Sequence, residues 1–194
     1  KIAAVNQTDL IVLPEMFSTG FSMNAETLAE TIEGTAVQWM KSIAGSKNCV
    51  VCGSLLLKEG DKFYNRLVWM QPDGQYELYD KRHLFSLSTE PQIFTPGSER
   101  LIVTLKGWKI CPLVCYDLRF PVWSRNKFTK SETDKPGTWQ YDVLIYVANW
   151  PEVRNYPWKQ LLIARAIENQ CYVLASAQGG EHENGRKTHG HSMI

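Results

Sequence analysis

Short apolar runs separated by turn residues recur along the chain, and their lengths predict buried strands. Leu10–Leu13 is a continuous apolar run that ends at Pro14, and Val50–Leu57 is a second run. Apolar runs of about four to eight residues without alternation are typical of strands buried on both faces. The same pattern predicts two further buried strands at Val143–Ala148 and Tyr172–Ala177.

Two turn signals predict hairpins between other apolar segments. Gln71–Gly74 (QPDG) and Lys106-Gly107 each contain residues that favour tight turns. The strand pairs expected on either side of these turns are Arg66–Met70 with Gln75–Tyr79, and Leu101–Leu105 with Trp108–Val114.

Apolar residues at helical spacing predict two helices, Ala36–Ala44 and Tyr156–Gln170. Pro157 suits the first turn of the second helix. Apolar side chains surround most of the circumference of that helix: Trp158, Leu161, Leu162, Ile163, Ala166 and Ile167. Such a helix is expected to be buried on more than one side, which a sheet and a second subunit together would supply.

Strands mixed with helices predict a mixed α/β layered fold, and a length of 194 residues fits a single domain over 1–194. The polar stretch Lys127–Trp139 is expected to be a surface loop. The chain starts at Lys1 in what resembles the tail of a helix and stops at Ile194 in a strand expected to begin at His191. We therefore expect a trimmed or partly ordered chain.

Charge and cysteine content narrow the class of protein. Lys and Arg number 21 against 20 Asp and Glu, which gives a formal net charge of +1 without the basic excess of a nucleic-acid binder. No apolar run approaches the roughly 20 residues that a membrane span needs. Five cysteines form an odd set in a chain large enough to fold without disulfides, which favours reduced thiols and a cytoplasmic location.

Three reactive side chains follow predicted strands. Glu15 comes directly after LIVLP, Lys81 lies in YDKRHLF, and Cys115 ends the strand in LVCYDLRFP. Taken singly, each has an ordinary explanation, as a solvated Glu, a solvated Lys and a small core thiol. A Cys at a strand-to-turn junction, however, is exposed as a nucleophile, and the backbone N–H groups that follow it can form an oxyanion hole.

Together these segments match one family. LPEMFSTGF, YDKRHLF and LVCYDLRFPVWSRN, followed by YVANWP and ARAIENQ, resemble the nitrilase superfamily of carbon–nitrogen hydrolases over roughly Asp9–Ile194, and most of all its bacterial ω-amidase branch. The resemblance implies an α-β-β-α sandwich that pairs as a homodimer, or a higher homo-oligomer, into a longer layered stack. It also implies that this chain lacks the first strand and the C-terminal segment of the family.

The resemblance further implies catalytic roles. Glu15, Lys81 and Cys115 would form a Glu–Lys–Cys triad, and Glu90 in SLSTEPQIFTPGS matches a further family Glu, although the segment around it is less typical. The expected reaction releases ammonia from a small terminal amide through a Cys thioester, with no metal and no organic cofactor. The expected substrates are dicarboxylate monoamides such as α-ketoglutaramate.

Substrate-binding residues are predicted more loosely. Arg154, after YVANWP, is the candidate partner of the far substrate carboxylate, while Phe17, Tyr116 and Trp150 are candidate walls of a small pocket. Each of these also has an ordinary explanation as a solvated loop Arg or a core aromatic. Arg119 is interpreted as a structural pairing residue.

Four alternatives stay open at this point. His83 and Cys115 offer a Cys–His hydrolase, and a metal site is conceivable from a CxxC and an HxH, formed by Cys49, Cys52, His189 and His191. Successive strand residues point to opposite faces, so Cys49 and Cys52 are expected to diverge. A different amidase or a nitrilase within the superfamily is a third possibility, and an inactive scaffold with the same fold is a fourth.

Overall fold

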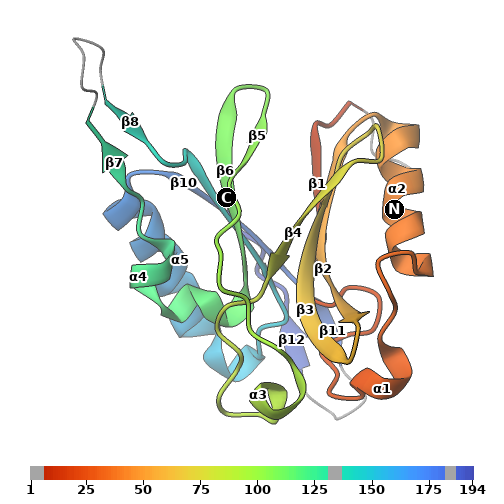
Figure 1. Ribbon diagram of the computed structural model, residues 1–194. Coiled ribbons are helices and arrows are strands. Elements are labelled where there is room, and N and C mark those ends of the chain that lie inside the picture. The colour runs from red at the N-terminus through yellow and green to blue at the C-terminus, as the bar shows by residue number, and fades with distance from the viewer. Residues whose placement is uncertain (1–6, 131–136, 182–186) are drawn as a thin grey trace. The chain divides into compact units, whose positions relative to one another are not determined.

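The computed structural model describes residues 7–130, 137–181 and 187–194 (Figure 1). The chain divides into two compact units, residues 1–99 and 100–194. Each unit contains a four-stranded sheet with a long helix packed against it. The mixed α/β prediction is therefore confirmed, whereas the helix tail expected at Lys1 lies outside the described residues.

The sheet of unit 1 has the strand order β1-β2-β3-β4. Its strands are β1 (Leu10–Val12), β2 (Val50–Glu59), β3 (Lys62–Met70) and β4 (Tyr76–Asp80). β1 is parallel to β2, and the other neighbours are antiparallel. The hairpin predicted around Gln71–Gly74 is confirmed, but β3 begins four residues earlier than expected because it forms a second hairpin with β2.

Burial in this sheet follows strand position. Every residue of Val50–Leu57 in β2 is buried, as the unbroken apolar run predicts. β1 is only half-buried, so the expectation of a fully buried strand there is wrong. The reason is topological, since β1 has a neighbour on one side only and forms an edge of the sheet.

Helix α2 (Thr35–Lys47) covers one face of this sheet and confirms the first predicted helix. Its buried residues, Ala36, Val37, Met40 and Ala44, follow helical spacing and pack on Val51, Leu55, Leu57, Val68 and Met70. The helix ends at Lys47 and is capped by Asn48, whose left-handed backbone (φ 52°) lets its N–H bond the carbonyl of Ala44. Two four-residue helices, α1 (Ala25–Leu28) and α3 (Glu90–Ile93), also lie in the described part of this unit.

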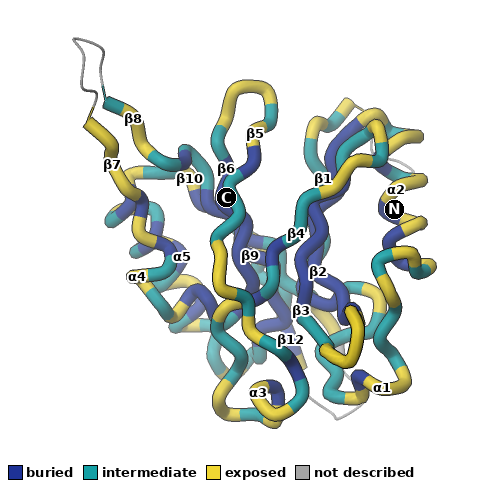
Figure 2. The backbone as a smooth tube through the Cα atoms, viewed as in Figure 1, coloured by how far each residue is buried: buried dark blue, intermediate teal, exposed yellow. Residues whose placement is uncertain are grey.

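The sheet of unit 2 has the strand order β10-β9-β6-β5. Its strands are β5 (Val103–Leu105), β6 (Trp108–Val114), β9 (Val143–Ala148) and β10 (Tyr172–Ala177). β6, β9 and β10 are parallel, and β5 returns from β6 through the predicted Lys106-Gly107 turn. β9 is buried along nearly its whole length, while the edge strand β10 alternates between buried and more exposed positions, which corrects the prediction of a fully buried strand (Figure 2).

Helix α5 (Asn155–Asn169) packs against β10 and confirms the second predicted helix. Its buried residues, Trp158, Leu162, Arg165 and Asn169, form one stripe. Ile163 and Ile167 are 45% and 72% exposed, so the expected burial on more than one side does not occur within this chain. Burial of that face by a second subunit stays a prediction.

The remaining segments are short. β7 (Phe128–Thr129) pairs with β8 (Thr138–Trp139), so the predicted loop 127–139 begins and ends as a two-residue ladder. β11 (Gly179–Glu181) pairs with β12 (Lys187–His189). The strand expected from His191 is reduced to a single bridge between Met193 and Ala175. Within the described ranges, no helix is both long and apolar enough to cross a membrane.

Candidate active site

Glu15 is carried by a loop that leaves β1 and crosses over β2. The N–H of Leu13 donates to the carbonyl of Cys52 at 2.7 Å. Met16 (φ 44°) donates its N–H to the Ser54 hydroxyl at 3.0 Å, and the N–H of Phe17 donates to the Ser54 carbonyl at 3.2 Å. These bonds fix the loop on both sides of Glu15, whose side chain is fully buried.

Gly53 of β2 makes this close crossing possible. A Cβ atom at Gly53 would lie 2.8 Å from Cβ of Leu13 and 3.1 Å from Cδ1 of Phe17. Carbon atoms do not approach so closely without displacement, since their optimal separation is about 3.5–4.0 Å. A glycine is therefore required here by space rather than by backbone conformation.

Lys81 follows β4 and reaches the same place from the other edge of the sheet. Its N–H donates to the carbonyl of Asn65 at 3.0 Å, and its carbonyl accepts the N–H of Gly97 at 3.1 Å. β1 and β4 are separated by two strands, roughly 14 Å at the usual spacing. The loop over β2 and the long lysine side chain close that gap, and Nζ of Lys81 lies 2.9 Å from Oε1 of Glu15.

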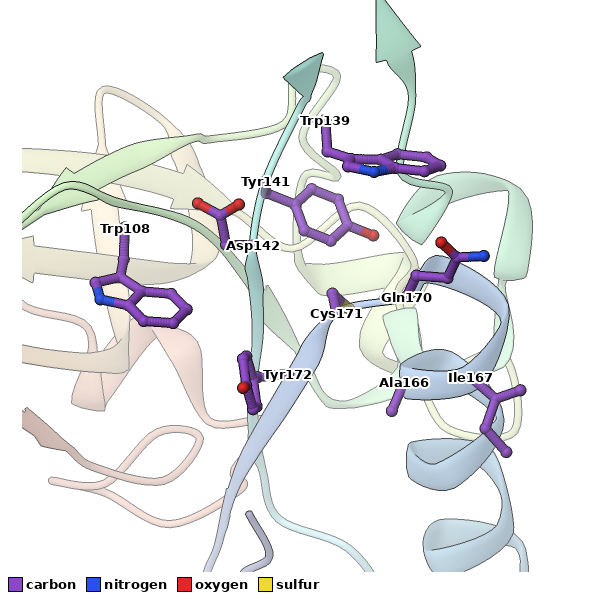
Figure 3. A pocket seen from close by; sticks show the side chains of 9 residues that line it. All are labelled: Trp108, Trp139, Tyr141, Asp142, Ala166, Ile167, Gln170, Cys171 and Tyr172. Carbon is purple, nitrogen blue, oxygen red and sulfur yellow. The ribbon is translucent and has the colours of Figure 1, made fainter. Parts of the chain in front are cut away.

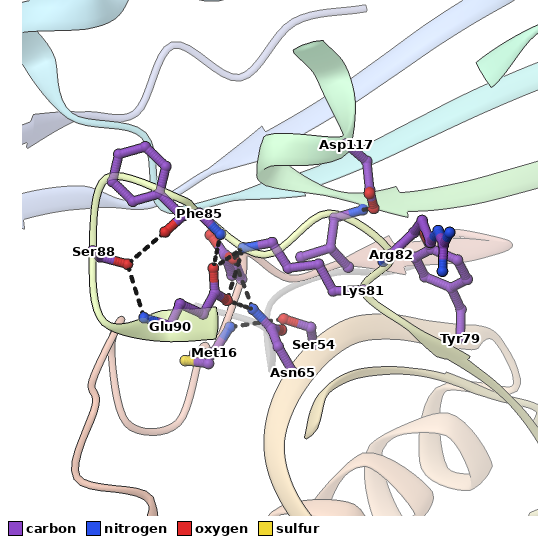
Figure 4. Close-up of polar contacts among 12 residues, drawn as sticks. Met16, Ser54, Asn65, Tyr79, Lys81, Arg82, Phe85, Ser88, Glu90 and Asp117 are labelled. Carbon is purple, nitrogen blue, oxygen red and sulfur yellow. Dashed lines mark hydrogen bonds and ion pairs between the residues drawn. The ribbon is translucent and has the colours of Figure 1, made fainter. Parts of the chain in front are cut away.

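Glu90, the first residue of α3, contacts the same lysine, Lys81. Its Oε1 and Oε2 lie 2.9 and 3.0 Å from Nζ of Lys81 (Figure 4). Glu90 is held in turn by the N–H of Phe85, which donates to Oε2, and by Ser88, whose hydroxyl accepts the Glu90 N–H at 3.1 Å. The structure thus brings Glu15, Lys81 and Glu90 together.

Asn65 of β3 is a member of this cluster that the sequence reasoning missed. Its Nδ2 donates to Oε1 of Glu15 at 2.8 Å and to Oε1 of Glu90 at 3.4 Å. A strand predicted from Arg66 left Asn65 outside the sheet. No local signal could have found it, because the segment Lys62–Arg66 shows no alternation of apolar and polar residues.

The charges of the cluster are buried and paired. Glu15, Lys81 and Glu90 are each at most 1% exposed, and the aromatic ring of Phe21 lies 5.4 Å from Nζ of Lys81. Burying ions is costly unless close partners compensate. Two carboxylates around one ammonium form an arrangement that can hold a cation beside a reacting oxygen and transfer protons through a carboxylate.

Cys115 stands at a strained turn in unit 2. It follows β6 and opens the short helix η2 (Cys115–Arg119), with a positive φ of 44° that non-glycine residues seldom adopt. The carboxylate of Asp117 accepts the N–H of Val114 at 3.1 Å, and Nη2 of Arg165 in α5 donates to the carbonyl of Leu118 at 2.6 Å. Such a constrained strand-to-helix turn is the geometry that presents a nucleophile.

The other thiols are poor nucleophiles. Burial raises the pKa of Cys111 to about 12 and that of Cys171 to about 11. Burial likewise raises the pKa of Cys52 and Cys49 above the ordinary thiol value. These four thiols stay protonated near neutral pH, so none of them fits the role of reactive cysteine.

The predicted substrate-binding residues of unit 2 lie at or near the strand ends. β6 and β9 are parallel, and the last residue of β6, Val114, pairs with Val147 near the end of β9, so Tyr116 and Trp150 follow from the same edge of the sheet. The ring of Tyr116 packs edge-on against Phe120 at 5.3 Å. Trp150 is buried, and its Nε1 donates to the carbonyl of Arg154 at 2.8 Å.

Arg154 closes the short helix η3 (Glu152–Arg154) and is half-buried. Arg119 lies over the ring of Trp150, 5.4 Å from its centroid, which agrees with a structural pairing. In unit 1, Phe17 packs against Trp39 at 5.7 Å and against the α2 core. The roles of these residues toward a substrate stay predictions.

An open pocket of about 490 Å³ lies in unit 2 (Figure 3). It is lined by side chains from β6, β8, α5, β10 and the segment that precedes β9, among them Trp108, Tyr141, Cys171 and Tyr172. None of the predicted catalytic or substrate-binding residues lines it. It is therefore not the site that the sequence predicts.

The alternative metal site has no support from the part of the chain that is described. Cys49 packs in the α2 core, while Cys52 lies in β2 outside that cluster. The side chain of His189 lies outside the described residues. Among the described side chains, no group of three or more His, Cys, Asp or Glu is arranged to hold a metal ion.

Comparison with known proteins covers the whole chain. A family model described as carbon-nitrogen hydrolase matches residues 1–194. Omega-amidase YafV of Yersinia enterocolitica is 44% identical over 195 residues, a match that covers 100% of this chain and 71% of that protein. The 2-oxoglutaramate amidase of Bacillus subtilis strain 168 is 38% identical, over 96% of this chain and 69% of that protein.

A solved structure is similar as well. XC1258 from Xanthomonas campestris, a CN-hydrolase superfamily protein with an arsenic adduct in the active site, matches with a TM-score of 0.93 and 44% identity. The match covers 98% of this chain and 71% of that one. The similarity in sequence is therefore matched by a similarity in fold.

Proposed function

Because this chain belongs to the carbon–nitrogen hydrolase family, we propose that it is an ω-amidase that releases ammonia from small dicarboxylate monoamides. Relatives named omega-amidase and 2-oxoglutaramate amidase support this substrate class. The observation that carries the proposal is the buried Lys81 ammonium between the carboxylates of Glu15 and Glu90.

In the proposed first half-reaction, Glu15 takes the proton of the Cys115 thiol, and the thiolate attacks the carbonyl carbon of the terminal amide. A C–S bond forms, and negative charge develops on the former carbonyl oxygen. Lys81 and the backbone N–H of Tyr116 stabilise this charge. The C–N bond then breaks as Glu15 returns the proton to the leaving nitrogen, which yields ammonia and a thioester at Cys115.

In the proposed second half-reaction, water attacks the thioester. Glu15 accepts a proton from the water, and Glu90 helps to hold Lys81 and the water in place. The C–S bond breaks, Cys115 regains its proton, and the product is a carboxylic acid. The sum of both halves is an amide and water converted to an acid and ammonia, so no oxidant, metal or organic cofactor enters the balance.

We propose Arg154 as the residue that binds the far carboxylate of the substrate. It follows β9 at the sheet edge where Cys115 follows β6, and a guanidinium binds carboxylates through paired N–H donors. Phe17, Tyr116 and Trp150 would then supply apolar walls. In Arg154→Ala, KM for α-ketoglutaramate should rise while kcat changes little; an unchanged KM would refute the assignment.

The proposed activity is tested by ammonia release from a panel of small monoamides, α-ketoglutaramate among them. The parent should release ammonia, Cys115→Ala should release none, and Cys171→Ala, whose thiol stays protonated, should match the parent. Activity retained in Cys115→Ala would disprove the thioester mechanism. His83→Ala separates the alternative Cys–His hydrolase, because a catalytic histidine would cost orders of magnitude in rate whereas the Glu–Lys–Cys set tolerates the change.

We also propose that residues 1–194 act as one catalytic domain in a cytoplasmic homodimer. The exposed Ile163 and Ile167 of α5 provide an apolar face that a second copy would bury. Light scattering should give twice the chain mass for the parent, and Ile167→Lys should lower it. A parent that stays monomeric at micromolar concentration would refute the dimer.

A further inference from the structure

Asn65 contacts three members of the proposed catalytic set although it is not one of them. Its side chain donates to Oε1 of Glu15 at 2.8 Å and more weakly to Oε1 of Glu90 at 3.4 Å. Its backbone carbonyl accepts the N–H of Lys81 at 3.0 Å. One residue of β3 therefore holds the carboxylate with its side chain and the amine-bearing residue with its main chain.

The orientation of the Asn65 amide is set by its neighbours. Two carboxylates face it, so the NH₂ end must point toward them, because a carboxylate offers only acceptors. The opposite end, Oδ1, is buried and has no hydrogen-bond partner among the described residues, and Asn65 is only 1% exposed. An unpaired buried acceptor destabilises a fold, so folding alone does not account for an amide at this position.

Both donors fall on the same oxygen of Glu15. Lys81 reaches Oε1 at 2.9 Å and Asn65 reaches it at 2.8 Å. Two charge-assisted or polar donors on one oxygen fix the plane of the carboxylate. The direction of the second oxygen, Oε2, is thereby fixed as well.

We propose that Asn65 is a positioning residue that holds the Glu15 carboxylate through Oε1 in the orientation needed for proton exchange during amide hydrolysis. This inference rests on the proposed function. Glu15 then accepts the thiol proton and delivers it to the leaving nitrogen, while its Oε1 stays bound to Asn65 and Lys81. Asn65 itself touches no reacting atom.

Two substitutions at Asn65 should shift the pH–rate profile in opposite directions. In Asn65→Ala, kcat should fall about 10- to 100-fold, the effect of losing one hydrogen bond to a charged group. KM should change less than about threefold, and the acidic limb should move to higher pH because an ionised Glu15 has lost a donor. In the isosteric Asn65→Asp, the new acid donates only while protonated, so the optimum should move to lower pH.

Asn126→Asp is the matched control. Asn126 is also a buried amide, whose Nδ2 donates to the carbonyl of Tyr141 at 2.9 Å in unit 2. The same chemical change there should lower the melting temperature but leave both limbs of the pH profile in place. If the Asn65 variants likewise lower stability and kcat without moving either limb, Asn65 is a structural residue and the inference is wrong.

A measurement that needs no turnover separates this inference from the proposed function. The ¹³C resonance of the Glu15 carboxyl carbon, assigned by its loss in Glu15→Gln, is followed against pH in the parent and in Asn65→Ala. Glu15 should take up its proton at a higher pH in Asn65→Ala, and identical titrations would overturn the inference. A parent that releases no ammonia would refute the proposed function, and the titration would still decide the role of Asn65.

Discussion

Replacing Lys81 with Met removes the ammonium that contacts both buried carboxylates of unit 1. Three N–O contacts of 2.9–3.0 Å disappear, and Glu15 and Glu90 keep their charges in a site at most 1% exposed. Breaking a buried pair by removing one partner costs about 3–5 kcal/mol. For a chain of this size, that loss corresponds to a melting temperature lower by about 6–20 °C.

The pH dependence of this loss follows from the charges. Without Lys81, one of the two carboxylates binds a proton more readily in the folded protein than in the unfolded chain. A folded state that binds more protons gains stability as pH falls, so the deficit of Lys81→Met relative to the parent should shrink from about pH 7 to about pH 5. Urea unfolding of both proteins at the two pH values measures it.

A double substitution and an exposed lysine provide the controls. Lys81→Met combined with Glu90→Gln should recover part of the loss, because the site then holds one carboxylate in place of two. Lys41→Met on the exposed face of α2 should change stability by less than about 0.5 kcal/mol. A Lys81→Met protein as stable as the Lys41 control, or a deficit independent of pH, would refute the view that Lys81 neutralises this cluster.

Three further outcomes are expected. Gly53→Ala should displace the loop that carries Glu15, so kcat should fall at least about tenfold while the fold is retained. Ammonia release measures the fall in kcat, and circular dichroism checks the fold. Arg165→Met removes the bond to the Leu118 carbonyl and leaves the Cys115 turn less fixed, so both kcat and the melting temperature should drop; an unchanged kcat would show that the turn needs no clamp. Since the pKa of Cys111 is raised to about 12 and that of Cys171 to about 11, alkylation of both thiols should be slow at pH 8 and accelerate only above about pH 10, and fast labelling at pH 8 would contradict their burial.

The strands and helices were largely predictable because their signals are local. Apolar runs and turn residues place β2, β4, β6 and β9 close to their observed positions. Burial of the edge strands was predicted less well, because a strand loses one neighbour at a sheet edge and nothing in the run Leu10–Leu13 reveals that position. The exposed side chains of Ile163 and Ile167 show the same for a helix, because an apolar pattern does not reveal which of its sides has a packing neighbour.

Members of the candidate site were predictable only where a recognisable sequence motif contained them. Glu15 and Lys81 stood out because each follows a strand, and the family resemblance added Glu90; the structure brings these three together. Asn65 belongs to no recognised motif, and its position beside Glu15 and Lys81 depends on the register of β3 with β4. A polar residue inside a strand gives no sign of its partners until the neighbouring strands are aligned.

The central claim is that the carboxylate of Glu15 activates the thiol of Cys115. The rate at which iodoacetamide alkylates Cys115 at pH 7, measured by peptide mass spectrometry, tests it most directly. Relative to the parent, Glu15→Gln should slow the reaction at least about tenfold, whereas Glu26→Gln, a change at an exposed Glu of α1, should leave it unchanged. Equal alkylation rates in the parent and in Glu15→Gln would contradict the account.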